Sequence, residues 1–413
     1  MYEFYSLILY FSLFISLFFE VFLLITYLEV KSEIDEEKRF AGPITFHPTT
    51  IIVPCYNEEK TIKATVNSIL NLDYPHDKLS IILVDDGSTD RTLLELNKFK
   101  NYYNVRILAK ENGGKHTAVN LALEHVETEL VGCLDADSFV SPQALLAIVR
   151  HFGNPEVMAV TPSIKVHEPK NILQYIQSTE YKWSIFLRRM LGSLGALYVT
   201  PGPFSIFRTR VFRELGNYRY AHMTEDMEMA MRMQKHRYKI VNSHSAHVYT
   251  VTPDTLRGLV KQRARWSYGF LNNAFDYKEI FFNRKYGHFG MFIMPIATLS
   301  LFTSLIMVSR ILFSFGSTTL KYFDRYQVAG LNWKLSSPSF DWYFINTGVL
   351  PLVVITALSL TLVILYLSVK LSDGKFRLSQ GLFYYLFLYT FMAPLWLVKA
   401  LFDTAFRRKV SWR

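Results

Sequence analysis

Residues 80–90 read SIILVDDGSTD, and this stretch decides the fold class of the chain. An apolar run from Ser80 to Val84 has the length of a buried strand. It ends at two carboxylates and a Gly-Ser turn, and helical spacing begins near Asp90. A buried strand that ends in a polar turn before a helix is the repeating unit of a parallel α/β sheet.

The same unit recurs on both sides of this stretch. Further strands are predicted at 50–54, 105–109 and 130–134, with helices at 61–70 and from about 115 to 124. Sheets of this doubly wound kind bind ligands beyond the carboxyl ends of their strands. The acidic and glycine-rich residues stand at those ends, so a ligand site is expected there.

Composition places this α/β part beside membrane segments. The chain has 413 residues, 50% of them hydrophobic and 19% charged, which is too apolar for a disordered protein and too charged for one embedded throughout. Lys and Arg number 45 against 35 for Asp and Glu, which suits an anionic partner: nucleic acid, lipid headgroups or a phosphorylated substrate. No nucleic-acid recognition motif is present, so no nucleic-acid partner is expected. Cys55 and Cys133 each lie in a strand-like run, which predicts free thiols.

Four windows have about the ~20 apolar residues that cross a hydrocarbon core. They are residues 5–28, 289–315, 343–369 and 381–398, the last interrupted by Pro394. Positive charge follows the first window and none precedes it, which predicts a cytosolic location for the next domain. Four full crossings would place the basic residues at 407–413 outside, so either the last window does not fully cross or another helix does.

We therefore expect four parts. They are an N-terminal transmembrane helix (1–30), a cytosolic catalytic domain (46–250), interfacial amphipathic helices (251–287) and a C-terminal transmembrane region of about three helices (288–413).

Three acidic groups are candidates for chemistry. Asp85 and Asp86 can accept hydrogen bonds from a base or ribose, although a helix cap by Ser88 or Asp90 explains the turn equally well. Asp135 and Asp137 can hold a divalent ion against diphosphate oxygens, and an Asp-rich turn is the alternative.

The third group is Thr224-Glu225-Asp226, at the start of a methionine-rich helix. A carboxylate there can take a proton from a hydroxyl nucleophile. The alternative is an N-cap by Thr224 with acids that favour the helix dipole. The methionines at 227, 229, 231 and 233 are expected in the core.

A basic, aromatic helix is predicted at about 254–273. Its spacing places Gln262, Arg265 and Trp266 on one face, where Arg can clamp phosphate and Trp can stack on a sugar ring. A membrane-surface helix with snorkelling arginines is a second reading, and both can hold. Gly113-Gly114-Lys115 can offer a cation to phosphate or form a simple glycine turn.

In this order and spacing, the motifs resemble those of the processive, membrane-embedded family 2 glycosyltransferases. The segments that carry the resemblance are Pro54 to Glu58, Asp85 to Ser88, Asp135 to Asp137, Thr224 to Asp226 and Gln262 to Trp266. That family includes cellulose, chitin, hyaluronan and poly-N-acetylglucosamine synthases, and the Thr-Glu-Asp form looks closest to poly-β-1,6-N-acetylglucosamine synthases. The similarity covers roughly residues 46–285.

The resemblance implies an α/β GT-A, Rossmann-like domain inserted between transmembrane helices, with a UDP-sugar donor. It assigns Asp85, Asn57 and Lys115 to the nucleotide, Asp137 to Mg²⁺ or Mn²⁺ as the main ligand, and Asp135 to the ribose or the metal. Asp226 would be the general base with Glu225 beside it. Gln262, Arg265 and Trp266 would hold the diphosphate and the acceptor, and the segment 198–205 resembles the floor of the acceptor site.

The implied function is inverting transfer of a sugar, N-acetylglucosamine in the nearest relatives, to a β-linked polysaccharide that crosses the plasma or inner membrane. Two alternatives stay open: transfer of one sugar to a lipid, and a non-catalytic polysaccharide-binding membrane protein. The expected partners are the UDP-sugar, the polysaccharide and membrane lipids, with room for a small membrane accessory subunit.

Overall fold

The computed structural model describes residues 2–39, 44–329 and 349–406. Within them, one eight-stranded sheet has the order β3-β2-β1-β4-β7-β6-β8-β5. The four predicted strands are present as β1 (Thr49–Cys55), β2 (Leu79–Asp86), β3 (Val105–Lys110) and β4 (Leu130–Cys133). They pair in parallel, so their carboxyl ends meet at one edge, as expected from the sequence.

The second half of the sheet is mixed. It contains β5 (Ser138–Val140), β6 (Val157–Val166), β7 (Ser205–Arg208) and β8 (Lys239–Thr250). β7 runs antiparallel to β4 and β6, while β8 is parallel to β6 and antiparallel to β5. These four strands were not predicted from the sequence.

Helices cover both faces of the sheet because β-strand side chains alternate between the faces. Ile51, Val53 and Ile81 pack against α2 (Ile62–Leu70), α3 (Thr92–Asn97) and α5 (Ala144–Val149). Ile52 and Val84 face α4 (Lys115–Leu123) and α8 (Glu225–Lys235). The methionines at 229, 231 and 233 are fully buried in this second core, which confirms their predicted role.

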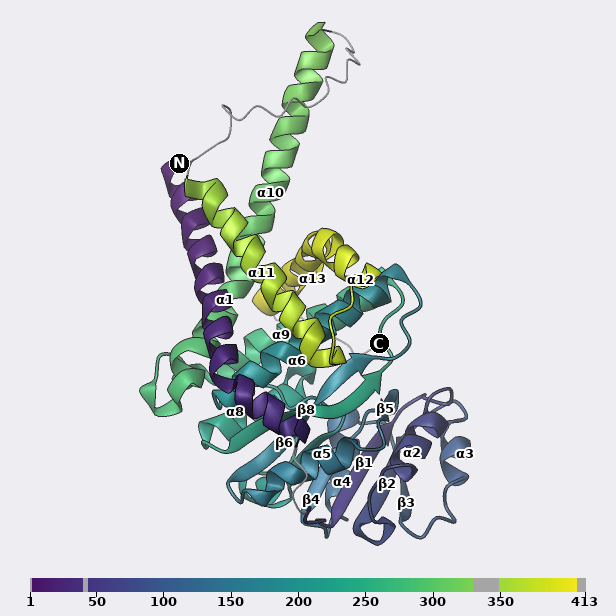
Figure 1. The fold of residues 1–413 in the computed structure, drawn as a ribbon. Helices are drawn as coiled ribbons and strands as arrows, with labels where there is room; N and C mark the ends of the chain where they lie inside the picture. Colours follow the sequence, from purple (N-terminus) through teal and green to yellow (C-terminus); the bar gives the residue numbers. More distant parts are fainter. Residues whose placement is uncertain (1, 40–43, 330–348, 407–413) are drawn as a thin grey trace.

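Two long helices lie between the sheet and the apolar segments. α6 (Ile172–Ser193) packs on β6 and β8, and α9 (Leu256–Asp276) extends the predicted helix by three residues at its end. A short α7 (Arg210–Leu215) follows β7. Figure 1 shows α6 and α9 at the top of the domain, directly beneath the apolar helices.

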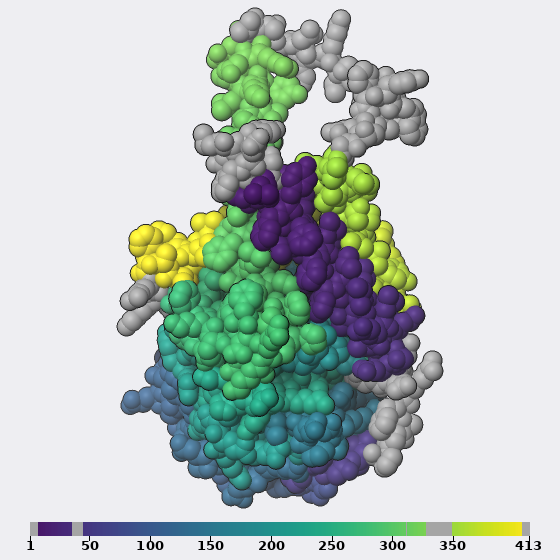
Figure 2. All heavy atoms as spheres, turned by 90° about the vertical axis from the view of Figure 1, so that its left-hand side faces the viewer, coloured from purple at the N-terminus to yellow at the C-terminus, as the bar shows by residue number. Residues whose placement is uncertain are grey.

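Four helices among the described residues are long and apolar enough to cross a membrane: Leu7–Ile34, Phe289–Gln327, Val349–Asp373 and Gln380–Ala405. They belong to α1 (Tyr2–Arg39), to η6 (Phe289–Ile293) with α10 (Met294–Ala329), to α11 (Val349–Asp373), and to α12 (Gln380–Tyr384), η8 (Tyr385–Tyr389) and α13 (Thr390–Ala405). Figures 1 and 2 show α1, α10 and α11 standing above the domain. The chain is therefore built as a membrane protein.

The last of the four helices differs from the others. α12 contacts α6, and α13 packs along α9, where Leu259 and Ala264 meet Trp396 and Leu397. It stays close to the domain while α1, α10 and α11 rise from it (Figure 1). The first, second and fourth predicted windows were shorter than the helices. The start of the third window (343–348) and the basic residues at 407–413 lie outside the described residues.

Candidate active site

The site begins where β1 and β2 end. The backbone N–H of Asn57 donates to Oγ of Ser88 (3.0 Å), and the N–H of Thr89 donates to Oδ1 of Asn57 (2.8 Å). Asn57 has a φ of 57°, in the left-handed region that Asn tolerates better than most residues. Its main structural effect is to join the loops that follow the two strands.

Asp86, rather than the predicted Asp85, lines the cavity at this edge. Its carboxylate accepts the N–H groups of Gly113 (3.1 Å) and Gly114 (2.9 Å) and pairs with Lys110 (2.8 Å). Asp85 points to the other face of the strand, where Oδ2 accepts from the N–H of Ser88 (3.3 Å) and the buried Oδ1 has no partner among the described residues. The two side chains diverge because successive residues of a strand face opposite sides.

The glycine turn after β3 places Lys115 in the site. Gly114 has a φ of 91°, a conformation that favours glycine, and α4 starts at the next residue. Nζ of Lys115 forms an ion pair with Oδ1 of Asp135 and lies 3.8 Å from Oε1 of Glu225. These acids, together with Cys133, raise the pKa of Lys115 well above its usual value despite burial, so it stays cationic.

Asp135 and Asp137 follow β4, as predicted. Burial raises the pKa of Asp137 to about 7, and repulsion from Asp135 and Glu58 adds to the effect. A hydrogen bond from Oγ of Ser138 (3.2 Å) opposes the shift only in part. This carboxylate therefore gains from a cation placed beside it.

The donor set fits a hard divalent ion of the Mg²⁺ or Mn²⁺ kind. Such ions are commonly held by one or two carboxylates and complete their shell with water and substrate phosphate oxygens. Asp135 and Asp137 supply that pair, although Lys115 already occupies one oxygen of Asp135. The described residues contain no group of three or more His, Cys, Asp or Glu side chains arranged to hold a metal alone, so phosphate oxygens would have to share the ion.

Glu225 and Asp226 stand at the start of α8. The N–H of Met227 donates to Oδ1 of Asp226 (2.9 Å), and the backbone oxygen of Asp226 accepts from N and Oγ1 of Thr200 (3.2 and 2.8 Å). The side chain of Thr224 makes no capping bond to this helix. It donates to the carbonyl of Ala221 (3.1 Å) and accepts from Asn273 (2.9 Å). Thr224 does occupy the N-cap position, with Glu225 and Asp226 in the first turn as the alternative reading expected, but it caps the helix without a side-chain bond.

The environment of Asp226 suits a proton acceptor. Burial and then the charge of Glu225 raise its pKa to about 6, while Lys115 and Arg265 oppose the shift. A carboxyl group with a pKa near 6 is ionised at neutral pH yet more basic than an exposed aspartate. The turn before it has positive φ at Ala221, His222 and Met223, a strained backbone of the kind found at functional sites.

α9 closes the site from above. Nη1 of Arg265 donates to the carbonyl of Met223 (2.8 Å), which fixes the strained turn against the helix. Oε1 of Gln262 accepts from Nη1 of Arg263 (2.6 Å), and the ring of Trp266 lies 4.2 Å from the guanidinium of Arg263. Gln262, Arg265 and Trp266 all line one cavity, as their helical spacing predicted.

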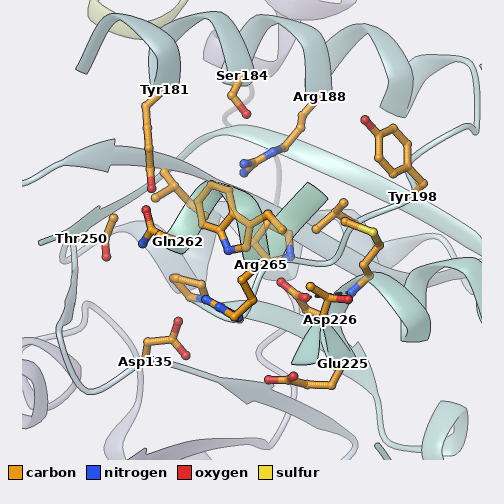
Figure 3. A pocket seen from close by; sticks show the side chains of 18 of the residues that line it. Asp135, Tyr181, Ser184, Arg188, Tyr198, Glu225, Asp226, Thr250, Gln262 and Arg265 are labelled. Carbon is orange, nitrogen blue, oxygen red and sulfur yellow. Dashed lines mark hydrogen bonds between the residues drawn. The ribbon is translucent and has the colours of Figure 1, made fainter. Parts of the chain in front are cut away.

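Two cavities share a wall. The first, of about 660 Å³, lies at the ends of β1 and β2 and is lined by Asn57, Asp86 and the glycine turn. The second, of about 360 Å³, lies between α6, α8 and α9 and is lined by Asp226, Arg265 and Trp266 (Figure 3). Lys115, Asp135 and Asp137 line both of them. Every predicted site residue except Asp85 therefore lines one of two adjoining cavities.

Comparison with known proteins agrees with this arrangement. The family model described as glycosyl transferase family 2 matches residues 50–216. Residues 50–216 form a glycosyl transferase family 2 domain. The match contains β1 to β7 and the shared wall, but ends before Glu225, Asp226 and α9.

Curated relatives of this chain include synthases of a sugar polymer. The poly-beta-1,6-N-acetyl-D-glucosamine synthase of Staphylococcus epidermidis is 31% identical over 223 residues, and that of Staphylococcus aureus is 32% identical. Each match covers 53% of this chain and 54% of the relative, so the chain spans about half the length of the curated relatives it matches.

A solved structure resembles the whole chain. A mannosyltransferase from Pyrobaculum calidifontis, in complex with GDP-Man and Mn²⁺, aligns over 96% of this chain and 99% of its own, with a TM-score of 0.59 and 18% identity. At this identity the likeness establishes the fold alone, a GT-A domain with apolar helices.

One set of cavity residues was not predicted. Tyr181, Ser184 and Arg188 project from α6 into the second cavity of the glycosyl transferase domain (Figure 3). Their spacing of three and four residues places them on one helix face, and this was the available signal. Without a strand or turn motif nearby, a polar stripe on α6 is indistinguishable in sequence from a solvated face.

Proposed function

We propose that this chain is an inverting glycosyltransferase that adds a sugar from a UDP-sugar, N-acetylglucosamine in the first instance, to a growing β-linked polysaccharide. The observation that carries the proposal is the shared wall. Lys115, Asp135 and Asp137 lie between the two cavities. The first is lined by polar groups that can bind a nucleotide, and the second contains the carboxylate of Asp226 and the ring of Trp266. A donor in the first cavity would present its sugar to an acceptor in the second.

The first cavity supplies groups suited to the nucleotide. Asn57 and Asp86 offer hydrogen-bonding oxygens and an amide at the ends of β1 and β2. Lys115 supplies a fixed cation where the diphosphate would lie, and Arg265 approaches the shared wall from α9. A bidentate guanidinium and an ammonium both favour phosphate oxygens.

Asp137, with Asp135 beside it, would hold the divalent ion. Bound there, Mg²⁺ or Mn²⁺ supplies charge neutralisation for the departing UDP. Asp137 carries the larger part because Lys115 already engages Asp135, whereas no ion pair to Asp137 is present among the described residues. The raised pKa of Asp137 also means that a neighbouring cation would favour its ionised form.

Asp226 would act as the general base. A sugar hydroxyl is a poor nucleophile, and removing its proton as it attacks speeds the reaction. The oxygen forms a bond to the anomeric carbon while the bond to UDP breaks, and the proton passes to Oδ of Asp226. One displacement inverts that carbon, so an α-linked donor yields a β-linkage.

Trp266 and the helices above the cavity suit a polymer product. An indole beside the base provides a stacking surface for the sugar at the chain end. The growing polysaccharide would cross the plasma membrane between the apolar helices, which are α1, α10, α11 and the helix from α12 to α13. The sheet domain would then lie on the cytosolic side.

The test is incubation of membranes that contain the protein with a panel of labelled UDP-sugars, followed by linkage-specific hydrolases. We expect a polymer from UDP-N-acetylglucosamine that a β-1,6-specific hydrolase degrades. A lipid-soluble product that carries a single sugar would instead establish transfer to a lipid and end the polymer proposal. Absence of UDP release with every donor would contradict catalysis itself.

A further inference from the structure

Arg188 is a cation in the second cavity to which the proposed reaction gives no role. It lies on the face of α6 that lines this cavity. Its Nη1 atom is fully buried and has no hydrogen-bond partner among the described residues. Buried guanidinium nitrogens are almost always satisfied, and a buried donor without an acceptor is destabilising. Burial of the Arg188 guanidinium is therefore unfavourable unless a ligand accepts a hydrogen bond from its Nη1 atom.

The geometry directs this group at the reacting end of the cavity. Tyr181, Ser184 and Arg188 descend from α6, while Glu225 and Asp226 rise from the opposite wall (Figure 3). Among the described residues, no carboxylate is in ion-pair contact with Arg188, although Asp226 is near enough to influence it electrostatically. A space therefore separates a hydrogen-bond donor from the proposed base.

The charges around this space favour a neutral ligand. Five carboxylates line the cavity, at 135, 137, 180, 225 and 226, against three cations at 115, 188 and 265. A further anion beside Arg188 would meet the carboxylates of Glu225 and Asp226, and a cation would meet Arg188 directly at the acceptor end. Two tyrosines and Trp266 add aromatic surface suited to a sugar ring.

We propose that Arg188 is an acceptor-binding and specificity-determining residue. Its Nη1 donates to an oxygen of the terminal acceptor sugar, namely the carbonyl of an acetamido group or a hydroxyl, and this contact brings the attacking hydroxyl to Asp226. Because a protonated amine carries positive charge and no acceptor oxygen, Arg188 disfavours de-N-acetylated chain ends. This inference rests on the proposed function, since it names the acceptor of that reaction.

The experiment compares Arg188→Gln and Arg188→Lys with the full-length protein, using UDP-N-acetylglucosamine and two soluble acceptors. One acceptor is a short β-1,6-linked N-acetylglucosamine oligosaccharide, and the other is its de-N-acetylated form. Transfer and UDP release to water are measured separately. Arg257→Gln, a change at an exposed arginine on α9, is the matched control.

For Arg188→Gln we expect the KM of the N-acetylated acceptor to rise about 10- to 100-fold, the effect of one hydrogen bond from a charged donor. The KM of the donor and the rate of UDP release to water should stay within about twofold, and Arg188→Lys should recover part of the loss. The preference for the N-acetylated acceptor should shrink in Arg188→Gln. Unchanged donor affinity also shows that the variant is folded.

Two results would overturn the proposal: an unchanged acceptor KM, or an equal rise in donor and acceptor KM. Failure of the proposed function is distinct, because the unaltered protein would then neither transfer sugar nor release UDP.

Discussion

Arg263 holds Glu180 through two parallel hydrogen bonds, from Nε to Oε1 (3.0 Å) and from Nη2 to Oε2 (2.7 Å). The same guanidinium lies over the ring of Trp266, and the hydroxyl of Tyr389 donates to Glu180 (3.2 Å). One buried ion pair thus connects α9, α6 and η8. Arg263 itself does not line the second cavity, yet its two neighbours in this network, Gln262 and Trp266, do.

Removal of Glu180 should destabilise the protein strongly. Glu180→Ala leaves Arg263 buried without its counter-ion, which typically costs about 3–5 kcal/mol. We expect a clear fall in the thermal unfolding temperature of the detergent-purified protein. Glu95→Gln, which breaks an exposed pair with Lys98, should cost under about 1 kcal/mol. An equal effect of the two variants would contradict a structural role for the buried pair.

Asp226→Asn should abolish turnover and keep donor binding. An amide cannot accept the proton of the attacking hydroxyl, and loss of a general base lowers rates about 10²- to 10⁴-fold. Affinity for UDP, measured by calorimetry, should change little because Asp226 does not line the first cavity. Asp77→Asn, at an exposed site, is the control. Turnover at the normal rate would remove Asp226 from the mechanism.

The pH dependence of kcat should follow Asp226. Its pKa is raised to about 6, and the base is active only when deprotonated, so kcat should rise with pH up to about 6 and level off above it. Glu225→Gln removes a negative neighbour that raises this pKa, and it should move the acidic limb to lower pH. If the acidic limb of the Glu225→Gln profile stays at the same pH, a group other than Asp226 controls that limb.

Substitution of Asp86 should raise the KM of the donor, whereas substitution of Asp85 should not. Asp86→Asn weakens the contacts to Gly113, Gly114 and Lys110, which shape the first cavity, so the KM of the UDP-sugar should rise about tenfold, as for loss of one or two net hydrogen bonds. Asp85→Asn should leave that KM within about twofold, because Asp85 does not line this cavity. Steady-state kinetics with varied donor distinguish the two, and the reverse order would place Asp85 at the nucleotide.

Removal of divalent ions by a chelator should stop the reaction, because Asp137 is the proposed ligand of the required ion. We expect EDTA to abolish turnover, and Mn²⁺ to strengthen UDP binding in the unaltered protein but not in Asp137→Ala. Asp73→Ala, at an exposed position, should keep the effect of Mn²⁺. UDP binding by Asp137→Ala that still responds to Mn²⁺ would count against this ligand.

The sequence predicted the parallel half of the sheet because its information is local. Each of β1 to β4 is an apolar run that ends in a polar turn, and each was placed within about two residues. β6, β7 and β8 depend instead on pairings between residues about 50 to 90 positions apart, such as Val160 with Ile206 and Ile164 with Val248. No local pattern specifies such partners.

The sequence held a signal that Asp86, and not Asp85, lines the first cavity. Every second residue of β2 points to the same face of the sheet. Ile81 and Leu83 face α2 and α5, and Asp85 is the next residue on that face. Val84 packs on the α4 side, and Asp86 continues towards the Lys115 end of α4. Alternation along the strand thus identifies Asp86 as the residue on the ligand side, once the location of α4 is known.

The packing of α13 on α9 affects how this protein can be handled. Trp396 and Leu397 are buried against Leu259 and Ala264, one turn or less from Gln262 and Arg265. A water-soluble fragment that ends after α9 would expose this apolar seam and remove Tyr389 from Glu180. The sheet domain and the apolar helix packed on it therefore stabilise each other, and experiments on this protein need both.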